Sequence, residues 1–331
     1  MGGGIDIIVP CYGYGHYLPE CIESVLQERK RDIRILIIDD ASPDETAEVA
    51  AALAEKDRRI AWRRHTANRG HIATYNEGLE WASAEYTLLL SADDLVLPGA
   101  LSRAAELLDT HPEVGFAYGP FIRLRDGDPR PPELDLPPVP GWTILSSAEF
   151  FRSNRPLNIV GTCTAVVRTK LQKIIGGYRP ELPHAGDMEM WMRFAAHGPV
   201  GRLNAYQGIY RWHPRAMSET YYDKIILDLR QRKAAVDLVF EEYGDRIPEA
   251  EELRNYLHEG LAEYAIWCTS EPFERGDLEN FDVLLEFATS TCPALRRSLN
   301  WKLLQVKRML GPRLWSTILP ARRLATAYRV S

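Results

Sequence analysis

The chain has 331 residues, enough for one large domain or a domain with an appendage, and its 45% hydrophobic and 26% charged residues are ordinary for a globular protein. Its 40 Lys and Arg against 46 Asp and Glu give a formal net charge of −6, which argues against nucleic acid as a partner. No stretch approaches the roughly 20 consecutive apolar residues that cross a bilayer, and no leader-like segment precedes the first predicted strand, so no membrane-spanning segment is expected.

Cysteine usage points away from metal and disulfide chemistry. The five cysteines are odd in number, widely scattered and without C-x-x-C spacing (Cys11, Cys21, Cys163, Cys268 and Cys292). We therefore expect neither structural zinc nor a disulfide framework, and a reducing cytoplasm fits best.

The first 124 residues alternate between predicted strands and predicted helices. Strands are predicted over 5–10, 32–40, 60–65, 85–94 and 114–124, and helices over 17–29, 42–56, 71–83 and 98–112. This alternation is typical of a mostly parallel sheet with helices in its crossovers, and near-continuous apolar strands such as ILII and TLLL favour a sheet covered on both faces. The expected fold class is therefore α/β.

The start of the second predicted helix carries a capping signal. In SPDETAEV, Ser42 stands where an N-cap is expected, Pro43 at the first helical position and Glu45 three residues after the cap. The sequence therefore predicts that this helix begins directly after Ser42.

Three further stretches complete the chain. Residues 125–141 are rich in proline without periodicity and predict a surface loop or lid. The strand-and-helix pattern resumes from 143 to 214, and beyond about 220 the sequence is helical almost throughout. The closing segment, 294–331, mixes apolar residues and two tryptophans with nine cations: Arg296, Arg297, Lys302, Lys307, Arg308, Arg313, Arg322, Arg323 and Arg329.

Carboxylate pairs follow two of the predicted strands. Asp39 and Asp40 end one strand, Asp93 and Asp94 end another, and Asp187 with Glu189 form a third acidic cluster. Ligands of parallel sheets bind beyond the carboxyl ends of the strands, and Mg²⁺ or Mn²⁺ prefers carboxylates completed by substrate phosphates. The pattern therefore suggests a divalent cation and a phosphorylated ligand. The alternative, in which one aspartate of each pair caps a helix and the other is solvated, stays open.

Five segments, taken together and in order, resemble family 2 glycosyltransferases, inverting enzymes of the GT-A fold. They are IIVPCYGYGHYLPECIESVLQE, ILIIDDASPDETAEV, NRGHIATYNEGLEWASAEYTLLLSADDLVLPGAL, GGYRPELPHAGDMEMWMRFAAHG and IYRWHPRAMS. The resemblance covers about 5–218. It implies a Rossmann-like, mostly parallel sheet flanked by helices, with a nucleotide-binding half at about 1–124 and an acceptor half at about 142–218. Residues 219–331 would form a C-terminal helical region with a basic amphipathic tail.

The resemblance also implies roles for single residues. Tyr12 would pack on the base of the donor nucleotide, Asp40 would accept a hydrogen bond from the base, and Asp93 would bind the ribose. The donor-binding residues would be Pro10, Tyr12, Asp39, Asp40, Arg69, Asp93 and Arg211. Asp94 and His213 would hold Mg²⁺ or Mn²⁺ on the diphosphate, Asp187 would be the catalytic base, and Glu189 and Trp191 would be acceptor-side candidates.

The sequence departs from the common family pattern at three positions. Gly186 replaces the usual Glu before the base, which removes a neighbouring like charge that could tune its pKa. Ser91 replaces an acidic residue that often opens the aspartate run, and Gly13 replaces a polar residue after Tyr12.

The basic tail has two interpretations. A basic amphipathic helix with tryptophan suits an anionic membrane surface, which would fit a lipid-linked acceptor and peripheral association with the inner face of the membrane. Alternatively, the tail docks on the acidic body or in a dimer contact, and the oligomeric state is left open.

The leading hypothesis is a metal-dependent inverting glycosyltransferase. It would move a sugar from a nucleotide sugar, most plausibly a UDP-sugar, to a glycan or lipid-linked acceptor in polysaccharide or glycoconjugate biosynthesis of the cell envelope. A nucleotidyltransferase is one alternative, although the first loop, PCYGYGHYLPE, lacks the Lys or Arg expected there. A non-catalytic nucleotide-sugar-binding module is the other.

Overall fold

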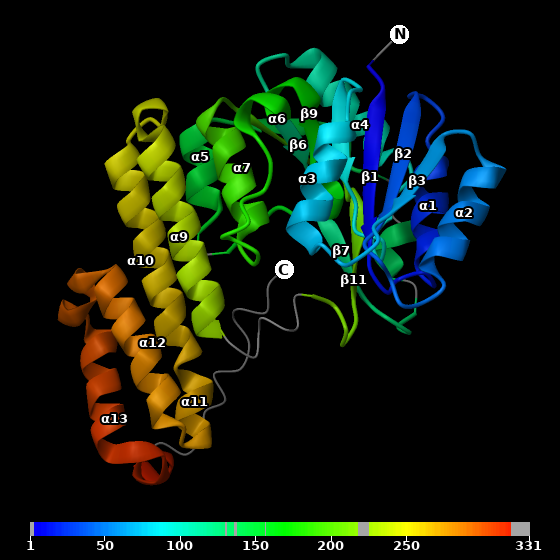
Figure 1. The fold of residues 1–331 in the computed structure, drawn as a ribbon. Helices are drawn as coiled ribbons and strands as arrows, with labels where there is room; N and C mark the ends of the chain where they lie inside the picture. Colours follow the sequence, from blue (N-terminus) through cyan, green and yellow to red (C-terminus); the bar gives the residue numbers. More distant parts are fainter. Residues whose placement is uncertain (1–2, 130, 136–137, 156, 218–224, 319–331) are drawn as a thin grey trace.

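The computed structural model describes residues 3–129, 131–135, 138–155, 157–217 and 225–318. Its centre is an eight-stranded sheet in the order β3-β2-β1-β4-β9-β6-β10-β8, beside a small sheet in the order β5-β11-β7 (Figure 1). The large sheet contains β1 (Ile5–Cys11), β2 (Ile33–Asp39), β3 (Ile60–Arg64), β4 (Tyr86–Leu89), β6 (Phe116–Tyr118), β8 (Trp142–Leu145), β9 (Val166–Arg168) and β10 (Val200–Leu203). The small sheet contains β5 (Leu95–Val96), β7 (Phe121–Arg125) and β11 (Gly208–Trp212).

The sheet is mostly parallel, as predicted. β1 pairs in parallel with both β2 and β4, and β2 with β3. Farther along, β9 runs antiparallel between β4 and β6, and β8 runs antiparallel to β10. The mixed order brings the end of β4 next to segments far away in the sequence.

Helices cover both faces of the large sheet (Figure 1). Successive residues of a strand point to opposite faces, and Ile7 and Ile8 of β1 accordingly belong to different core clusters. Residues of α1 (Leu18–Leu26), α2 (Thr46–Lys56) and α4 (Ala100–Thr110) pack on the face of Ile7. The opposite face is covered by residues of α3 (His71–Trp81), α5 (Ser147–Ser153), α6 (Thr169–Ile175) and α7 (Gly186–Ala196). The apolar strands are thus covered on both faces, as predicted.

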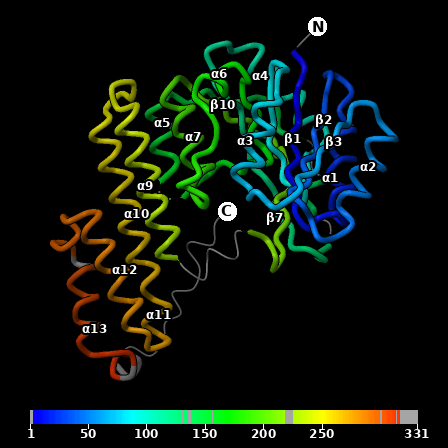
Figure 2. The backbone as a smooth tube through the Cα atoms, in the orientation of Figure 1, coloured from blue at the N-terminus to red at the C-terminus, as the bar shows by residue number. Residues whose placement is uncertain are grey.

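The C-terminal helices stand beside the α/β part and share its core (Figures 1 and 2). They are α9 (Ile225–Tyr243), α10 (Ala250–Cys268), α11 (Ser270–Arg275), α12 (Leu278–Thr291) and α13 (Leu299–Ile318). Buried residues of α9, α10 and α12 belong to the same cluster as those of α7. The predicted boundary at 218/219 lies outside the described residues, so it stays a prediction.

Part of the predicted basic tail lies against the protein's own helices. Trp301, Leu304 and Trp315 of α13 pack on a small buried cluster formed by Phe273, Phe281 and Leu285. Lys307 lies over the ring of Phe273 at 4.3 Å, and Arg308 forms an ion pair with Asp282. Residues 319–331 of the tail lie outside the described residues. Among the helices that are described, none combines the length and the apolar character that crossing a membrane requires.

The predicted helix start at Ser42 is wrong. α2 begins at Thr46, and its N-cap Glu45 makes no side-chain capping hydrogen bond. The oxygen expected to cap the helix accepts a hydrogen bond from the first loop instead, because Gly13 N–H lies 3.0 Å from Ser42 Oγ. The segment between β2 and α2 therefore stabilises the loop after β1 through this hydrogen bond.

Candidate active site

A cavity of about 750 Å³ opens where β1, β2 and β4 end. Six of the predicted site residues line it: Pro10, Tyr12, Asp40, Asp93, Asp94 and Asp187. The carboxyl edge of a parallel sheet is the expected place for a ligand. The carboxylates at the ends of β2 and β4 and the one on α7 thus share one cavity, although about 150 residues separate the first from the last.

The first aspartate pair shapes two turns. Asp39 is fully buried, accepts a hydrogen bond from Ser42 N–H at 2.8 Å and pairs with Arg64. Asp40 accepts hydrogen bonds from Arg69 N–H at 2.8 Å, from Gly70 N–H at 2.9 Å and from His65 Nδ1 at 2.7 Å. Burial by itself would raise the pKa of Asp40, but these donors outweigh it and lower the pKa. The charged form of Asp40 is therefore favoured at the cavity wall.

The loop after β1 is fixed by hydrogen bonds from its backbone N–H groups to side chains of the segment between β2 and α2. Gly13 has φ of 73°, a left-handed conformation that favours glycine, which explains the absence of a polar side chain there. Its N–H donates to Ser42, and Gly15 N–H donates to Asp44 Oδ2 at 3.1 Å. Tyr12, just before this turn, is 50% exposed and lines the cavity, so its ring is available to a ligand.

The second aspartate pair, Asp93 and Asp94, places two adjacent carboxyl groups inside the protein, where their charges repel each other. Asp93 and Asp94 are both buried, at 9% and 3% exposure. Burial, followed by the adjacent charge of Asp93, raises the pKa of Asp94 well above its usual range. Opposing this, Arg211 N–H donates to Asp94 Oδ1 at 2.9 Å, and Arg211 Nε donates to the Asp93 carbonyl at 3.0 Å. These bonds become possible because β5 and β11 pair, directly after the aspartates.

His213 and Arg211 contact this turn without lining the cavity themselves. His213 Nε2 lies 3.2 Å from Asp93 Oδ2, and its ring contacts Tyr14 edge-on at 5.2 Å. Arg211 stacks over Tyr17 at 4.8 Å and forms ion pairs with Glu20 and Asp126. Arg211, His213, Asp39 and Arg69 are not among the residues that line the cavity.

Asp93, Asp94 and His213 lie close together but do not form a complete set of metal ligands by themselves. Among the residues that the structure describes, no three His, Cys, Asp or Glu side chains are grouped closely enough to hold a metal ion. Mg²⁺ and Mn²⁺ sites that complete themselves with substrate phosphates need only one or two carboxylates. Asp94 fits such a site, because it is a buried carboxyl whose raised pKa Arg211 and Cys163 offset only in part.

Asp187 lies in the first turn of α7 and lines the cavity. Asn158 Nδ2 donates to its Oδ2 at 2.8 Å, and Met188 N–H donates to its Oδ1 at 2.7 Å. Burial raises the pKa of Asp187; the Met188 N–H and the charge of Arg232 oppose this rise, and the charge of Asp228 adds to it. A carboxylate with a raised pKa, oriented by an amide, is suited to accept a proton.

Gly186 has a steric explanation. A Cβ atom at this position would lie 3.3 Å from the Tyr178 ring, closer than ordinary contacts allow. Tyr178 is buried at 5% exposure, and its ring would have to shift by a few tenths of an ångström to admit a side chain at position 186. The residue usually found before the base is therefore difficult to accommodate here.

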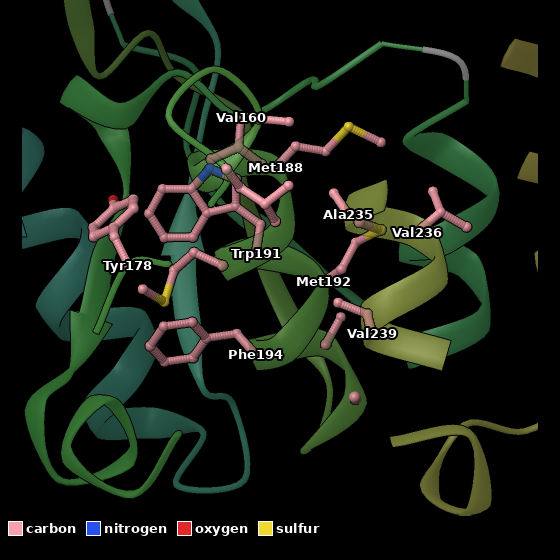
Figure 3. Close-up of a cluster of buried hydrophobic side chains, with 14 of the residues drawn as sticks. Val160, Tyr178, Met188, Trp191, Met192, Phe194, Ala235, Val236 and Val239 are labelled. Carbon is pink, nitrogen blue, oxygen red and sulfur yellow. The ribbon is translucent and has the colours of Figure 1, made fainter. Parts of the chain in front are cut away.

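Glu189 and Trp191 are directed away from the cavity. Glu189 is fully buried between Arg179 Nε, at 2.8 Å, and Arg193 Nε, at 2.7 Å. Trp191 is 2% exposed and stacks on Phe116, and Figure 3 shows it among the hydrophobic side chains of α7 and its neighbours. Neither residue lines the cavity. Their expected place beside the acceptor is therefore not supported, and both hold α7 in the core.

Several cavity residues escaped the sequence-based reasoning. They are Arg123, Asn158, Tyr178, His184, Tyr210, Arg215, Asp228 and Arg232. Asn158 stands in a stretch without periodicity, and Asp228 and Arg232 belong to a helix whose spacing indicated only packing. No local signal identifies such residues, because only the tertiary fold brings them to the cavity.

Comparison with known proteins supports the family resemblance. The family model described as "Glycosyl transferase family 2" matches residues 6–174. An uncharacterized protein of Mycobacterium tuberculosis, MT1568, is 27% identical over 59% of this chain and 63% of its own length. Glycosyltransferase GlyG of Streptococcus pneumoniae is 36% identical over 28% of this chain and 31% of its own. The matches thus span less than two-thirds of these curated relatives.

Solved structures resemble the whole chain. The 1–349 fragment of S. aureus TarS, crystallised with UDP, is 18% identical, with a TM-score of 0.61 over 98% of this chain and 93% of that one. The mannosyltransferase PcManGT from Pyrobaculum calidifontis, in complex with GDP-Man and Mn²⁺, is 18% identical, with a TM-score of 0.56 over 96% and 84%. At this level of identity the likeness shows the fold, which is of the GT-A type.

Proposed function

The chain belongs to glycosyl transferase family 2, and on that premise we propose that it transfers a sugar from a nucleotide-sugar donor to an acceptor hydroxyl with inversion at the anomeric carbon. One observation carries the proposal. A single cavity contains a buried aspartate pair at a strand end and, on α7, an aspartate with a raised pKa that Asn158 orients.

The donor would lie along the carboxyl ends of β1, β2 and β4. Tyr12 would pack on the base, Asp40 would fix the edge of the base and Asp93 would bind the ribose, with Pro10 lining the same wall. Asp39, Arg69 and Arg211 would act by holding these loops, since they do not line the cavity. We favour a UDP-sugar. UDP is the ligand of the TarS structure and GDP-Man that of PcManGT, so other nucleotides remain alternatives in the test.

Asp94 and the donor diphosphate would hold Mg²⁺ or Mn²⁺. His213, the other proposed ligand, contacts Asp93 Oδ2 and does not line the cavity, so its ring would have to move to reach the ion. A cation there offsets the repulsion between Asp93 and Asp94 and, when bound, stabilises the charge that develops on the leaving diphosphate. The presence of Mn²⁺ in the PcManGT complex agrees with this assignment.

Asp187 would accept the proton of the attacking hydroxyl. A neutral hydroxyl is a poor nucleophile, and a carboxylate within hydrogen-bond reach removes its proton as the new bond forms. Asn158 holds one carboxylate oxygen through a 2.8 Å hydrogen bond and so fixes the direction of the other. One base and one direct displacement invert the anomeric carbon without a covalent intermediate.

Transfer and donor hydrolysis with a panel of nucleotide sugars test the proposal. With Mn²⁺ or Mg²⁺ present, Asp187→Asn should lower kcat by about 10²–10⁴-fold. Asp94→Asn should abolish the response of the rate to metal. Asp57→Asn, which removes a surface ion pair with Arg59, is the matched control and should leave both rates unchanged. Full activity of the Asp187 variant would remove the proposed base.

The acceptor would be a glycan or a lipid-linked glycan used in the cell envelope, with the enzyme in the cytoplasm and possible contact with the inner membrane face through 294–331. The lining of the cavity continues from the nucleotide side to residues of α7 and α9, where the acceptor would lie.

A further inference from the structure

Helix α9 forms one wall of the cavity although it lies outside the family match. Asp228 and Arg232 line the cavity, and Gln231 lies on the same side of the helix at the intervening turn. Residues spaced three and four apart share a helix face. Farther along the same side, α9 is anchored in the core: Ala235, Val236 and Val239 face Met192 of α7 in Figure 3.

Gln231 holds the turn that leads into α7. Its Oε1 accepts a hydrogen bond from His184 N–H at 2.8 Å and a longer one from Ala185 N–H at 3.4 Å. These are the last residues before Asp187 enters the first turn of the helix. A side chain of α9 thus fixes the backbone that presents the base.

Asp228 and Arg232 form a partly buried ion pair that lines the cavity together with the base. Arg232 Nε donates to Asp228 Oδ2 at 2.6 Å. Arg232 Nη1 is buried and has no hydrogen-bond partner among the described residues. A buried polar group without a partner is costly, and such groups in native proteins commonly have a functional reason.

The members of this pair act on Asp187 in opposite directions. The charge of Arg232 lowers the pKa of Asp187, and the charge of Asp228 raises it. Other ionisable groups that line the cavity around α7 are His71 and Tyr75 on α3, and Tyr178 and His184 in the segment before α7. Burial lowers the pKa of both histidines and raises that of Tyr178, which favours the neutral forms near neutral pH. The charge balance at the base is therefore set by α9.

We propose that α9 is a working part of the active site, in which Gln231 positions the turn before Asp187 and the Asp228–Arg232 pair balances the charge around the base. Asp228 then supplies, from a distant helix, the like charge that Gly186 does not. This inference rests on the proposed role of Asp187. In the transfer step the acceptor O–H bond breaks, its proton moves to Asp187 and the oxygen bonds to the anomeric carbon. Arg232 favours the anionic base before this step, and Asp228 favours the protonated base after it.

The pH dependence of kcat/KM for transfer tests the pair. The rate rises with pH as the base loses its proton, so the acid limb reports the pKa of the base in the free enzyme. Arg232→Met should move this limb to higher pH by about one unit, and Asp228→Asn should move it to lower pH by a similar amount. The double variant should return near the wild-type position, because both charges are gone.

Lys233→Met is the matched control. Lys233 lies on the same helix but pairs with Asp237 at 2.5 Å, so its removal should leave the limb in place. Shifts in the same direction for Arg232→Met and Asp228→Asn, or no shift in either, would overturn the inference. Because Asp187→Asn is measured in the same assay, an inactive Asp187 variant with unmoved limbs would refute the α9 inference while keeping the proposed function.

A further variant separates an effect on the active site from an effect on folding. Removing one member of a buried pair destabilises a protein, so the melting temperature of each variant is measured alongside. Gln231→Leu keeps the charges and removes only the acceptor for the two amides. It should lower kcat about tenfold with an unchanged KM for the donor and an unmoved acid limb. An unaltered kcat would overturn the positioning role of Gln231.

Discussion

Asp94 is a residue whose ionised form is disfavoured in the folded protein. Burial and the neighbouring Asp93 both disfavour its ionised form, and only the Arg211 contacts and the Cys163 thiol oppose them. A group whose folded pKa lies above its unfolded value lowers stability as the pH rises through that interval. Without metal, the folded protein therefore loses stability as the pH rises from the unfolded value of about 4 through the raised folded pKa.

The Asp94→Asn variant should accordingly be more stable than the wild type when metal is absent. Asparagine is uncharged and still offers Oδ1 to Arg211 N–H. At pH 7 with a chelator, we expect its melting temperature to rise by about 1–2 °C, which corresponds to roughly 1 kcal/mol for a chain of 331 residues. The increase should shrink at about pH 3, below the unfolded pKa of about 4, where the wild-type carboxyl is largely protonated in both states. A lower melting temperature at pH 7 would show that the charge of Asp94 is compensated.

Asn158 sets the direction of the proposed base through one hydrogen bond. Asn158→Ala removes the 2.8 Å contact to Asp187 Oδ2. A hydrogen bond to a charged group contributes about 1.5–3 kcal/mol, so kcat should fall by at least about tenfold while the KM for the donor stays the same. Steady-state kinetics with varied donor provides the measurement. Asn204→Ala, which removes an exposed contact to the Pro140 carbonyl, is the control and should behave as the wild type.

At the scale of single residues, the sequence indicated the aspartates and missed their partners. Asp93 and Asp94 follow a predicted strand, and Asp187 lies in one of the segments that resemble the family. The strand pattern and the family resemblance therefore pointed to them. Asn158 and Arg232 lie in stretches whose local pattern is unremarkable, and only packing brings them to the cavity. Local signals therefore identify charged groups better than the neutral or distant groups that orient them.

At the scale of elements, the loop between β2 and α2 shows how tertiary contacts override local capping signals. Ser42 and Asp44 accept hydrogen bonds from Gly13 and Gly15 rather than capping a helix at Ser42. The apolar runs still predicted the first four strands and helices, because each buries a continuous stripe of side chains. The antiparallel insertion of β9 was not predictable in this way, since a strand's partner depends on the whole sheet.

Ser42→Ala tests whether that loop supports donor binding. The variant leaves Gly13 N–H without its acceptor and should loosen the turn that presents Tyr12. The KM for the donor should rise several-fold, by roughly 1 kcal/mol in free energy, with kcat changed little. Ser153→Ala removes a comparable hydroxyl contact in α5 and serves as the control. An unchanged KM in Ser42→Ala would mean that the first loop keeps its shape without this hydrogen bond.

At the scale of the whole molecule, one hydrophobic core joins the α/β part to the C-terminal helices. Buried side chains of α7 and α9 belong to the same cluster, which is why a helix outside the family match can line the cavity. The sequence predicted both parts and their order, but it did not predict this contact. Helical periodicity shows which face of α9 is apolar without showing what covers it.

Helix α13 bears on the membrane interpretation of the basic tail. Its residues Trp301, Leu304 and Trp315 pack on α11 and α12, so these apolar groups are occupied within the protein. Leu303, Val306 and Met309 are exposed, at 50%, 47% and 86%. Within the described part of the tail, attraction to a membrane would therefore rest on these side chains, on Leu314, which is also 50% exposed, and on the cations, each contributing about 1 kcal/mol near an anionic surface.

We expect full-length protein to bind vesicles that contain anionic lipid, weakly and in a salt-dependent way. Replacing the three arginines of the last ten residues by glutamine (Arg322, Arg323 and Arg329) should remove about 3 kcal/mol of attraction and most of the binding in a vesicle sedimentation assay. A charge-matched control replaces Lys30, Lys56 and Arg58 of the α/β part by glutamine and should retain binding. Equal binding by both triple variants, or binding that is insensitive to salt, would contradict a membrane role for the tail. Such a result would favour docking of these cations on the rest of the protein, which is acidic. The whole chain has a formal net charge of −6 although 294–331 contributes nine cations.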